Sequence, residues 1–351
     1  MSNKTLVILS PGFPIDEADT TCLPSQQLFI KEINKNFPSL KIIVLAFQYP
    51  FSKSEYEWNK NKVIAFAGNG RSKFQRLLLW IRIWKKLKKL KTENNIIGLL
   101  SFWCGETAFI GTWFGRKNKI KHYCWISGQD AKMNNKYVRW IRPKSVELIA
   151  MSDFLADELY QNHAVGPAHI IPIGIAPEMY LNRKNQRDID VLGVGSLIPL
   201  KQYDVFVRII ASLKNEMPSL KCVICGEGVE KNNLKYLIEK NNITDNVSLA
   251  GELPHQQVID LMQRTKIFLH TSSYEGFGAV CIEALAAGAH VISFIQPMND
   301  AIDHWHIVDN EIAMRGKLLV LLQNSGTTYE PVIPFLMSDA AKQIVGLFVE
   351  K

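Results

Sequence analysis

Two structural elements meet in the stretch Ser273-Tyr274-Glu275-Gly276-Phe277-Gly278-Ala279-Val280-Cys281-Ile282-Glu283-Ala284-Leu285-Ala286-Ala287-Gly288. The apolar run 267–269 precedes it and an Ala-rich run ends it, so the Gly-Phe-Gly turn is predicted to join a buried strand to a helix. The backbone N–H groups of Gly278, Ala279 and Val280 would then lie at the positive end of the helix dipole. Such a helix terminus favours a phosphate or a diphosphate.

Two glutamates stand eight residues apart around this turn. Glu275 would lie before the helix and Glu283 within its early turns, and each carboxylate can accept hydrogen bonds from vicinal hydroxyls. A diphosphate together with diols indicates a nucleotide-sugar as the ligand. The alternative is that both residues are ordinary acids at the start of a helix, where the dipole favours them.

The chain resembles the large retaining GT-B glycosyltransferase family, often called family 4 or group 1, whose E-x7-E signature is matched by Glu275 and Glu283. The resemblance covers roughly residues 188–294. It includes three further motifs in the family's order: Val194-Gly195-Ser196-Leu197-Ile198-Pro199-Leu200-Lys201, Ile224-Cys225-Gly226-Glu227-Gly228-Val229-Glu230 and Val247-Ser248-Leu249-Ala250-Gly251-Glu252-Leu253-Pro254. It implies an α/β fold of the GT-B class, with two Rossmann-like domains facing each other across a cleft.

The length and the hydrophobic pattern agree with that expectation. A chain of 351 residues can form two hydrophobic cores. Short apolar runs alternate with longer amphipathic runs, which predicts βα units and parallel sheets. We expect an N-terminal acceptor-side domain at 1–175, a donor-binding domain at 176–335, and a C-terminal helix at 336–351 that could pack back on the first domain. Ligands of such sheets bind beyond the carboxyl ends of the strands, so the cleft between the domains is the expected site.

The resemblance assigns roles on the donor side. It implies that Glu283 holds the nucleotide ribose, that Glu275 contacts the sugar and phosphate, and that Lys201 binds the diphosphate. Ser196 stands where the family commonly carries arginine, which removes one cation. The other residues expected to border the donor are Gly195, Gly226, Glu227, Glu252, Leu253, Gly276, Phe277, Gly278, Ala279 and Val280.

The N-terminal half supplies the remaining candidates. Trp125-Ile126-Ser127-Gly128-Gln129-Asp130 follows a predicted strand where the family often has a His-Gly-x-Asp-like segment, and Ser127 replaces the histidine. Asp130 is expected to contact the donor sugar and to complete a catalytic set with Glu275 and Lys201; a turn-forming role is the alternative. Asp16 lies in a loop at the family's acceptor-side position, which here lacks the usual paired glycines.

Composition limits the other classes of function. The six cysteines lie mostly in apolar stretches and indicate reduced core thiols. No D-x-D pair is placed to hold a catalytic metal, so we expect no metal and no cofactor beyond the nucleotide-diphosphate-sugar substrate, and no nucleic-acid partner. The first apolar run is too short for a signal peptide and none approaches the ~20 residues that span a bilayer. The sequence therefore predicts a cytoplasmic protein.

The net charge of +8 is concentrated in residues 71–91, which contain nine Lys or Arg and no acid. On a helical projection, lysines and arginines gather on one side of this segment and tryptophans and aliphatic residues on another. A core helix with a solvated outer face is one interpretation. The other is adhesion to an anionic membrane surface, which would make the protein peripheral on the inner face of the membrane.

These features favour a retaining, metal-independent glycosyltransferase with a saccharide or lipid-linked glycan as acceptor, acting in surface polysaccharide or glycolipid synthesis. A GT-B nucleotide-sugar epimerase would use a similar site without an acceptor. A catalytically silent, sugar-nucleotide-binding partner subunit is the third alternative, motivated by Ser196, Ser127 and a tail after Phe294 that departs from the family's pattern.

Overall fold

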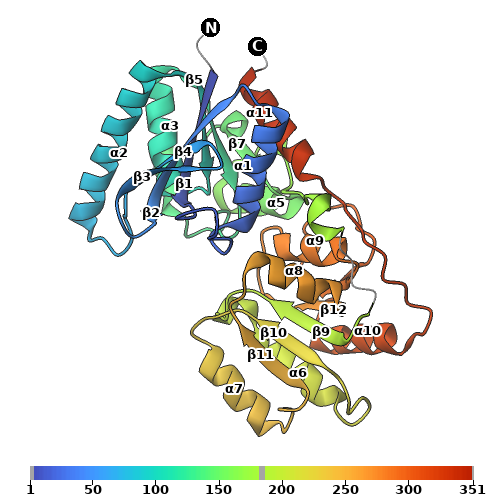
Figure 1. Cartoon of the computed structure of the whole chain (residues 1–351). Helices are drawn as coiled ribbons and strands as arrows, with labels where there is room; N and C mark the ends of the chain where they lie inside the picture. The colour runs from blue at the N-terminus through green and yellow to red at the C-terminus, as the bar shows by residue number, and fades with distance from the viewer. Residues whose placement is uncertain (1–3, 182–185, 350–351) are drawn as a thin grey trace. The chain divides into compact units, whose positions relative to one another are not determined.

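The computed structural model describes residues 4–181 and 186–349 (Figure 1). The chain divides into two compact units: unit 1 is Met1–Ile173 with Met337–Lys351, and unit 2 is Gly174–Leu336. Each unit is an α/β layer structure built on one mostly parallel sheet.

Unit 1 is organised around an eight-stranded sheet of order β3-β4-β2-β1-β5-β6-β7-β8. All neighbours are parallel except β3, which runs antiparallel to β4. The central strands are buried on both faces, which explains why the sequence shows them as continuous apolar runs. The strands are β1 (Lys4–Gly12), β2 (Lys41–Tyr49), β3 (Ser54–Trp58), β4 (Asn61–Ala65), β5 (Asn95–Phe102), β6 (His122–Ile126), β7 (Leu148–Ala150) and β8 (His169–Ile170).

Helices cover this sheet, and the last helix of the chain is one of them. α11 packs against α1 and β5, and the side chains of Lys121 and Tyr123 both donate to the Leu347 carbonyl. A side chain at Gly98 would overlap the ring of Phe348, so this helix is in close contact with the sheet. The helices of unit 1 are α1 (Pro24–Asn36), α2 (Lys73–Glu93), α3 (Glu106–Asn118), α4 (Lys136–Ile141), α5 (Asp153–His163), the 3₁₀ helix η1 (Ser145–Glu147) and α11 (Met337–Val349).

Unit 2 contains a six-stranded parallel sheet of order β11-β10-β9-β12-β13-β14. The chain leaves β9 toward β10 and β11 on one side and returns to β12 on the other, so the topological switch point lies between β9 and β12. Ligands of open parallel sheets bind at such a point. The strands are β9 (Ile189–Val194), β10 (Cys222–Cys225), β11 (Val247–Gly251), β12 (Thr265–His270), β13 (His290–Ser293) and β14 (Trp305–Ile307).

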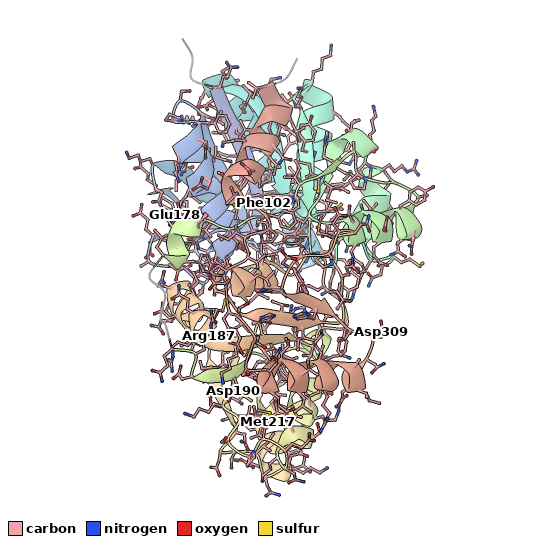
Figure 2. All side chains as sticks on the ribbon, turned by 90° about the vertical axis from the view of Figure 1, so that its right-hand side faces the viewer. Phe102, Glu178, Arg187, Asp190, Met217 and Asp309 are labelled. Carbon is pink, nitrogen blue, oxygen red and sulfur yellow. The ribbon has the colours of Figure 1, made fainter. Side chains whose placement is uncertain are left out.

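The helices of unit 2 enclose a core of branched aliphatic residues from both the strands and the helices. Arg187, labelled in Figure 2, lies shortly before β9. Its guanidinium donates to the carbonyls of Ala287 and Tyr329 at 2.8 and 3.3 Å and so holds this part of the chain against the unit. The helices are η2 (Pro177–Tyr180), η3 (Pro199–Lys201), α6 (Tyr203–Leu213), α7 (Lys231–Lys240), α8 (His255–Gln263), α9 (Ala279–Ala286) and α10 (Glu311–Gln323).

Candidate functional site

Lys201, Glu275 and His270 form a cluster at the switch point of unit 2. Lys201 Nζ makes an ion pair with Glu275 Oε2, and His270 Nε2 lies 3.4 Å from the same oxygen. The lysine and glutamate side chains are only 18% and 20% exposed. Lys201 does not open a helix: it ends η3, and the left-handed residue Gln202 separates it from α6. The lysine therefore extends from a tight turn just before the amino end of α6, and the carboxylate of Glu275 balances its charge.

The loops after β9 and β12 are held together by hydrogen bonds. Thr271 Oγ1 donates to the Lys201 carbonyl at 2.8 Å, and the Ser273 amide donates to the Leu200 carbonyl at 3.0 Å. Because these bonds fix both backbones, the ion pair between Lys201 and Glu275 is built on rigid neighbours.

The protonation state of Glu275 follows from its partners. Burial raises the pKa of this carboxyl. The hydrogen bond from His270 and the charge of Lys201 lower it by a larger amount, so that the pKa falls to about 2. Burial lowers the pKa of His270 below its usual range, so the imidazole is neutral near pH 7. Glu275 is therefore a carboxylate at neutral pH, and Lys201 balances its charge.

Glu283 lies on α9 and is buried, with 8% of its surface exposed. Its Oε1 is 3.0 Å from Nε2 of His255, the first residue of α8. Within the part of the chain that the structure describes, Oε2 of Glu283 has no hydrogen-bond partner. One carboxylate oxygen is thus positioned by α8, while the other can accept bonds from a ligand.

The amino end of α9 has the geometry of an anion site. Gly278 caps the helix with φ +78°, and the Cys281 amide donates to its carbonyl at 2.8 Å. Among residues 4–181 and 186–349, no acceptor is bonded to the amides of Gly278, Ala279 or Val280. Phe277 is buried, with its ring centroid 5.8 Å from that of Phe335, and this contact anchors the turn. The donors predicted from the sequence are therefore open.

Three neighbouring strands end in glycine turns that touch one another. The Gly195 amide donates to the Cys225 carbonyl at 3.0 Å, and the Gly226 amide donates to the Gly251 carbonyl at 2.8 Å. A Cβ on Gly226 would lie 2.0 Å from the Gly195 carbonyl oxygen, so only glycine fits there. Beside these turns Ser196 and Glu252 are exposed, Leu253 is half-buried, and Glu227 pairs with Lys231.

In unit 1 the predicted residues Asp130 and Asp16 both accept hydrogen bonds from backbone amides of loops. Asp130 Oδ2 accepts the amides of Cys104 and Ser127, at 2.8 and 3.0 Å, and so joins the loops after β5 and β6. Burial raises the pKa of Asp130 to about 7, although both amides act to lower it. Asp16 Oδ1 accepts the amides of Ala18 and Asp19, which shapes an exposed turn. Lys201 and Glu275 are thus in contact within unit 2, and Asp130 belongs to unit 1.

Two histidines in the site were not predicted. His270 is the last residue of β12, and His255 follows the Gly-Glu-Leu-Pro motif at the start of α8. A sequence signal existed for His270, because the residue at the carboxyl end of a strand beside a switch point faces the ligand side. For His255 the signal is weaker, since its contact with Glu283 depends on how α8 packs against α9.

Among the described residues, the site offers a cation and hydrogen-bond donors that suit an anion, and not a cluster of metal ligands. Within the described residues, no three His, Cys, Asp or Glu side chains converge to hold a metal ion. All six cysteines are free thiols; burial raises the pKa of Cys222 well above its usual range and that of Cys225 to about 11. Protonated thiols are poor metal ligands.

Most of the basic segment 71–91 lies in α2, whose amino end carries a capping box of Ser72 and Gln75. Leu79, Ile83, Leu87 and Leu90 face the core, so the amphipathic interpretation is correct for this side. The outer side is more apolar than the helical projection predicts. In the first half of α2 the exposed fractions of four apolar side chains are 39–69%: Phe74, Leu77, Leu78 and Ile81. Among the residues placed in the structure, no helix is long and apolar enough to cross a membrane.

Comparison with known proteins agrees with this geometry. Residues 180–309, which contain the whole unit 2 site, match the family model described as Glycosyl transferases group 1. The chain is 27% identical over 203 residues to the phosphatidylinositol N-acetylglucosaminyltransferase gpi3 subunit of Schizosaccharomyces pombe, covering 56% of this chain and 44% of that protein. The match thus spans less than half of that relative's length.

Solved structures establish the fold class. A glycosyltransferase from Rickettsia africae superimposes with a TM-score of 0.68 at 16% identity, covering 99% of this chain and 94% of the other. Anabaena HepE, solved with UDP and glucose, gives 0.65 at 14% identity and covers 99% and 95%. The prediction of an α/β GT-B fold with two Rossmann-like domains is confirmed.

Proposed function

We propose that this chain is a retaining glycosyltransferase that moves a sugar from a nucleotide-diphosphate-sugar to a saccharide or lipid-linked glycan acceptor. The cluster of Lys201 and Glu275 beside the open amides of α9 carries this proposal, because it places positive charge and hydrogen-bond donors at the switch point of a parallel sheet. The match of the same region to a glycosyltransferase family supports it.

Each group has a part in the proposed reaction. A diphosphate leaving group gains negative charge as its bond to the sugar breaks, and Lys201 with the amides of Ala279 and Val280 would stabilise that charge. Glu283, fixed by His255, would accept bonds from the ribose hydroxyls. Glu275 would hold the sugar hydroxyls while balancing the charge of Lys201. In the mechanism we propose, these charges and hydrogen-bond donors stabilise the leaving group without a metal ion.

The acceptor side is proposed from chemistry and from the relatives. The gpi3 subunit is named for transfer to phosphatidylinositol, which favours a lipid-linked acceptor and glycolipid or surface polysaccharide synthesis. HepE was solved with UDP and glucose, so uridine nucleotide-sugars are the first donors to test. The exposed Ser196, which stands in place of a cation, keeps two alternatives open: a nucleotide-sugar epimerase and a silent binding subunit.

Incubation of the protein with UDP-glucose or UDP-N-acetylglucosamine and a lipid extract should release UDP and label a lipid or saccharide, with the anomeric configuration kept. Activity should survive EDTA, because Lys201 and α9 meet the diphosphate. Nuclear magnetic resonance of the product measures configuration and yield. Recovery of an epimerised donor would favour the epimerase. Binding of the donor without any turnover would favour the silent subunit. Activity lost in EDTA and restored only by a divalent ion would contradict the metal-independent mechanism.

We also propose that the protein is cytoplasmic and adheres to the inner face of the membrane through α2. Each cation near an anionic surface adds about 1 kcal/mol, and exposed aromatic residues add interfacial burial. Co-sedimentation with phosphatidylglycerol vesicles should therefore fall as salt rises, and replacing Lys85, Lys88 and Lys89 by Gln should abolish it. Lys86 is left intact because it bonds to Glu55. Pelleting no greater than with phosphatidylcholine vesicles would refute membrane adhesion.

A further inference from the structure

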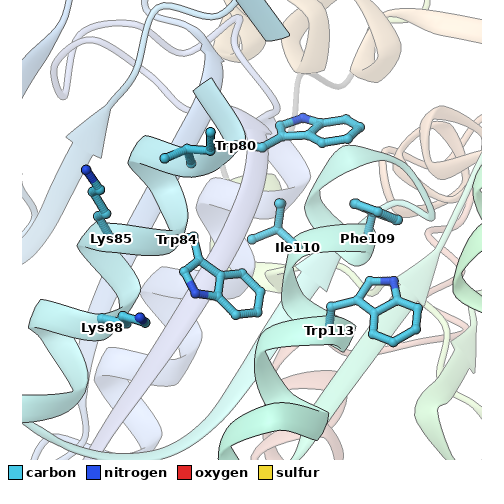
Figure 3. Close-up of a pocket in the computed structure, with 8 residues that line it drawn as sticks. Trp80, Trp84, Lys85, Lys88, Phe109, Ile110 and Trp113 are labelled. Carbon is cyan, nitrogen blue, oxygen red and sulfur yellow. The ribbon is translucent and has the colours of Figure 1, made fainter. Parts of the chain in front are cut away.

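An apolar groove of about 380 Å³ runs between α2 and α3 in unit 1 (Figure 3). Its volume lies within the ~300–1,000 Å³ that small-molecule sites occupy. Apart from two lysines of α2, its lining is aromatic or aliphatic. The apolar lining residues are Trp80, Ile81, Trp84, Phe109, Ile110 and Trp113.

The wall residues of the groove are held in place by contacts with one another and with neighbouring side chains. Trp80 Nε1–H donates to Glu106 Oε2 at 3.3 Å, and its ring packs against Phe109 with centroids 5.0 Å apart. Trp84 meets the ring of Phe114 edge-on at 5.1 Å. Large side chains stay open to solvent at the same place, since Ile81 is 44% and Trp113 45% exposed. A preformed apolar surface of this kind indicates a binding site, because exposing it to water is unfavourable.

The charged side chains in the lining of the groove are two lysines. Lys85 and Lys88 extend from α2 at its edge (Figure 3). In residues 4–181 and 186–349, no carboxylate lies within ion-pair distance of either lysine, whereas Lys86 pairs with Glu55 and Lys89 with Glu93. The ligand that complements this surface has an apolar body and an anionic end.

We propose that the α2–α3 groove binds one hydrocarbon chain of an anionic lipid, with the lipid's phosphate against Lys85 and Lys88. The apolar lining of the groove complements a hydrocarbon chain, and Lys85 and Lys88 beside it complement the charge of a phosphate. Phe74, Leu77 and Leu78 are exposed on the preceding turns of α2 and continue the apolar surface away from the groove. The proposal stands on this groove alone and does not depend on the sugar-transfer reaction.

Titration calorimetry with monomeric dodecyl phosphate, below its micelle concentration and without vesicles, tests the proposal. Binding should be saturable at one site per chain. Octyl phosphate should bind roughly 200-fold more weakly, because it lacks four methylenes and each methylene lost from an apolar site removes about 0.8 kcal/mol. Inorganic phosphate and dodecyltrimethylammonium should not bind. Equal binding of inorganic phosphate, or of the cationic detergent, would overturn the proposal.

Two variants separate the apolar and charged parts of the site. Ile81→Glu with Trp113→Glu changes half-exposed positions and should abolish binding of dodecyl phosphate while the melting temperature is kept. Lys85→Gln with Lys88→Gln leaves the apolar wall intact and should weaken binding at least tenfold. The matched control is Lys73→Gln with Lys91→Gln, which removes the same charge from α2 outside the groove and should bind like the wild type. Unchanged affinity in the first two variants would overturn the proposal, and since no donor or vesicle is present, the transferase and adhesion proposals would stand.

Discussion

Replacing Lys201 by alanine is expected to lower the rate of sugar transfer about 10²–10³-fold, the loss typical when one group that stabilises developing charge is removed. The same change should weaken nucleoside diphosphate binding by about 1.5–3 kcal/mol, since charge-assisted hydrogen bonds are lost. The physical reason is that Lys201 is the cation held at the switch point by Glu275. Initial rates and titration calorimetry measure the two effects.

The control for this prediction is Lys214→Ala, at the end of α6, where the ammonium bonds only to the Asn242 carbonyl among the described residues. This variant should keep wild-type rate and affinity. Glu283→Ala provides an independent check, because it removes the carboxylate proposed for the ribose while leaving Lys201 in place. Wild-type affinity for the nucleoside diphosphate in both Lys201→Ala and Glu283→Ala would reject the site.

The pH dependence of stability gives a second signature of Lys201→Ala. The pKa of Glu275 is lowered in the folded protein, from 4.5 to about 2, so its contribution to stability is present above pH 4.5 and is lost as pH falls toward 2. Without Lys201 only His270 remains to lower this pKa. The difference in free energy of unfolding between wild type and variant should therefore be largest near neutral pH and shrink toward pH 2, as urea titrations at several pH values would show.

The sequence was sufficient for features that depend on local pattern. Buried parallel strands such as β9 contain continuous apolar runs, here at 191–194, and the turn before α9 is marked by Gly276 and Gly278. Glu275 and Glu283 could be predicted as site residues because a helix start binds anions and carboxylates accept hydrogen bonds from hydroxyls. The open amides at 278–280 follow from the helix start itself.

Features that depend on tertiary packing could not be predicted. The contact of His255 with Glu283 requires that α8 lies beside α9, and Asp130 forms its bonds to a loop whose place is set by the order of β5 and β6. No apolar run marks the strand β3, because Ser54–Trp58 alternates polar and aromatic residues and gains its partners only beside β4. For α2, a helical projection gives the buried side, but the apolar residues left outside depend on where α3 packs.

Gly226→Ala is expected to destabilise the protein by about 2–4 kcal/mol, within the range of severe overpacking and backbone strain. The added Cβ would lie 2.0 Å from the Gly195 carbonyl oxygen, and this neighbour is backbone, which cannot move aside like a flexible side chain. Relief requires the turns after β9 and β10 to separate, and the Gly226 bond to Gly251 would be strained with them. Because these turns lie next to Lys201, nucleotide binding should weaken as well.

Gly316 supplies a matched control in the same unit. It lies inside α10, and a Cβ there meets no atom within 4 Å. Gly316→Ala should therefore stabilise the protein by about 0.5–1 kcal/mol, because alanine loses less conformational entropy in a helix than glycine does. Urea denaturation of both variants measures the contrast. If Gly226→Ala unfolded at the same urea concentration as the wild type, the contact between the turns after β9 and β10 would be looser than described, and these turns could not hold Lys201 in a fixed position for a diphosphate.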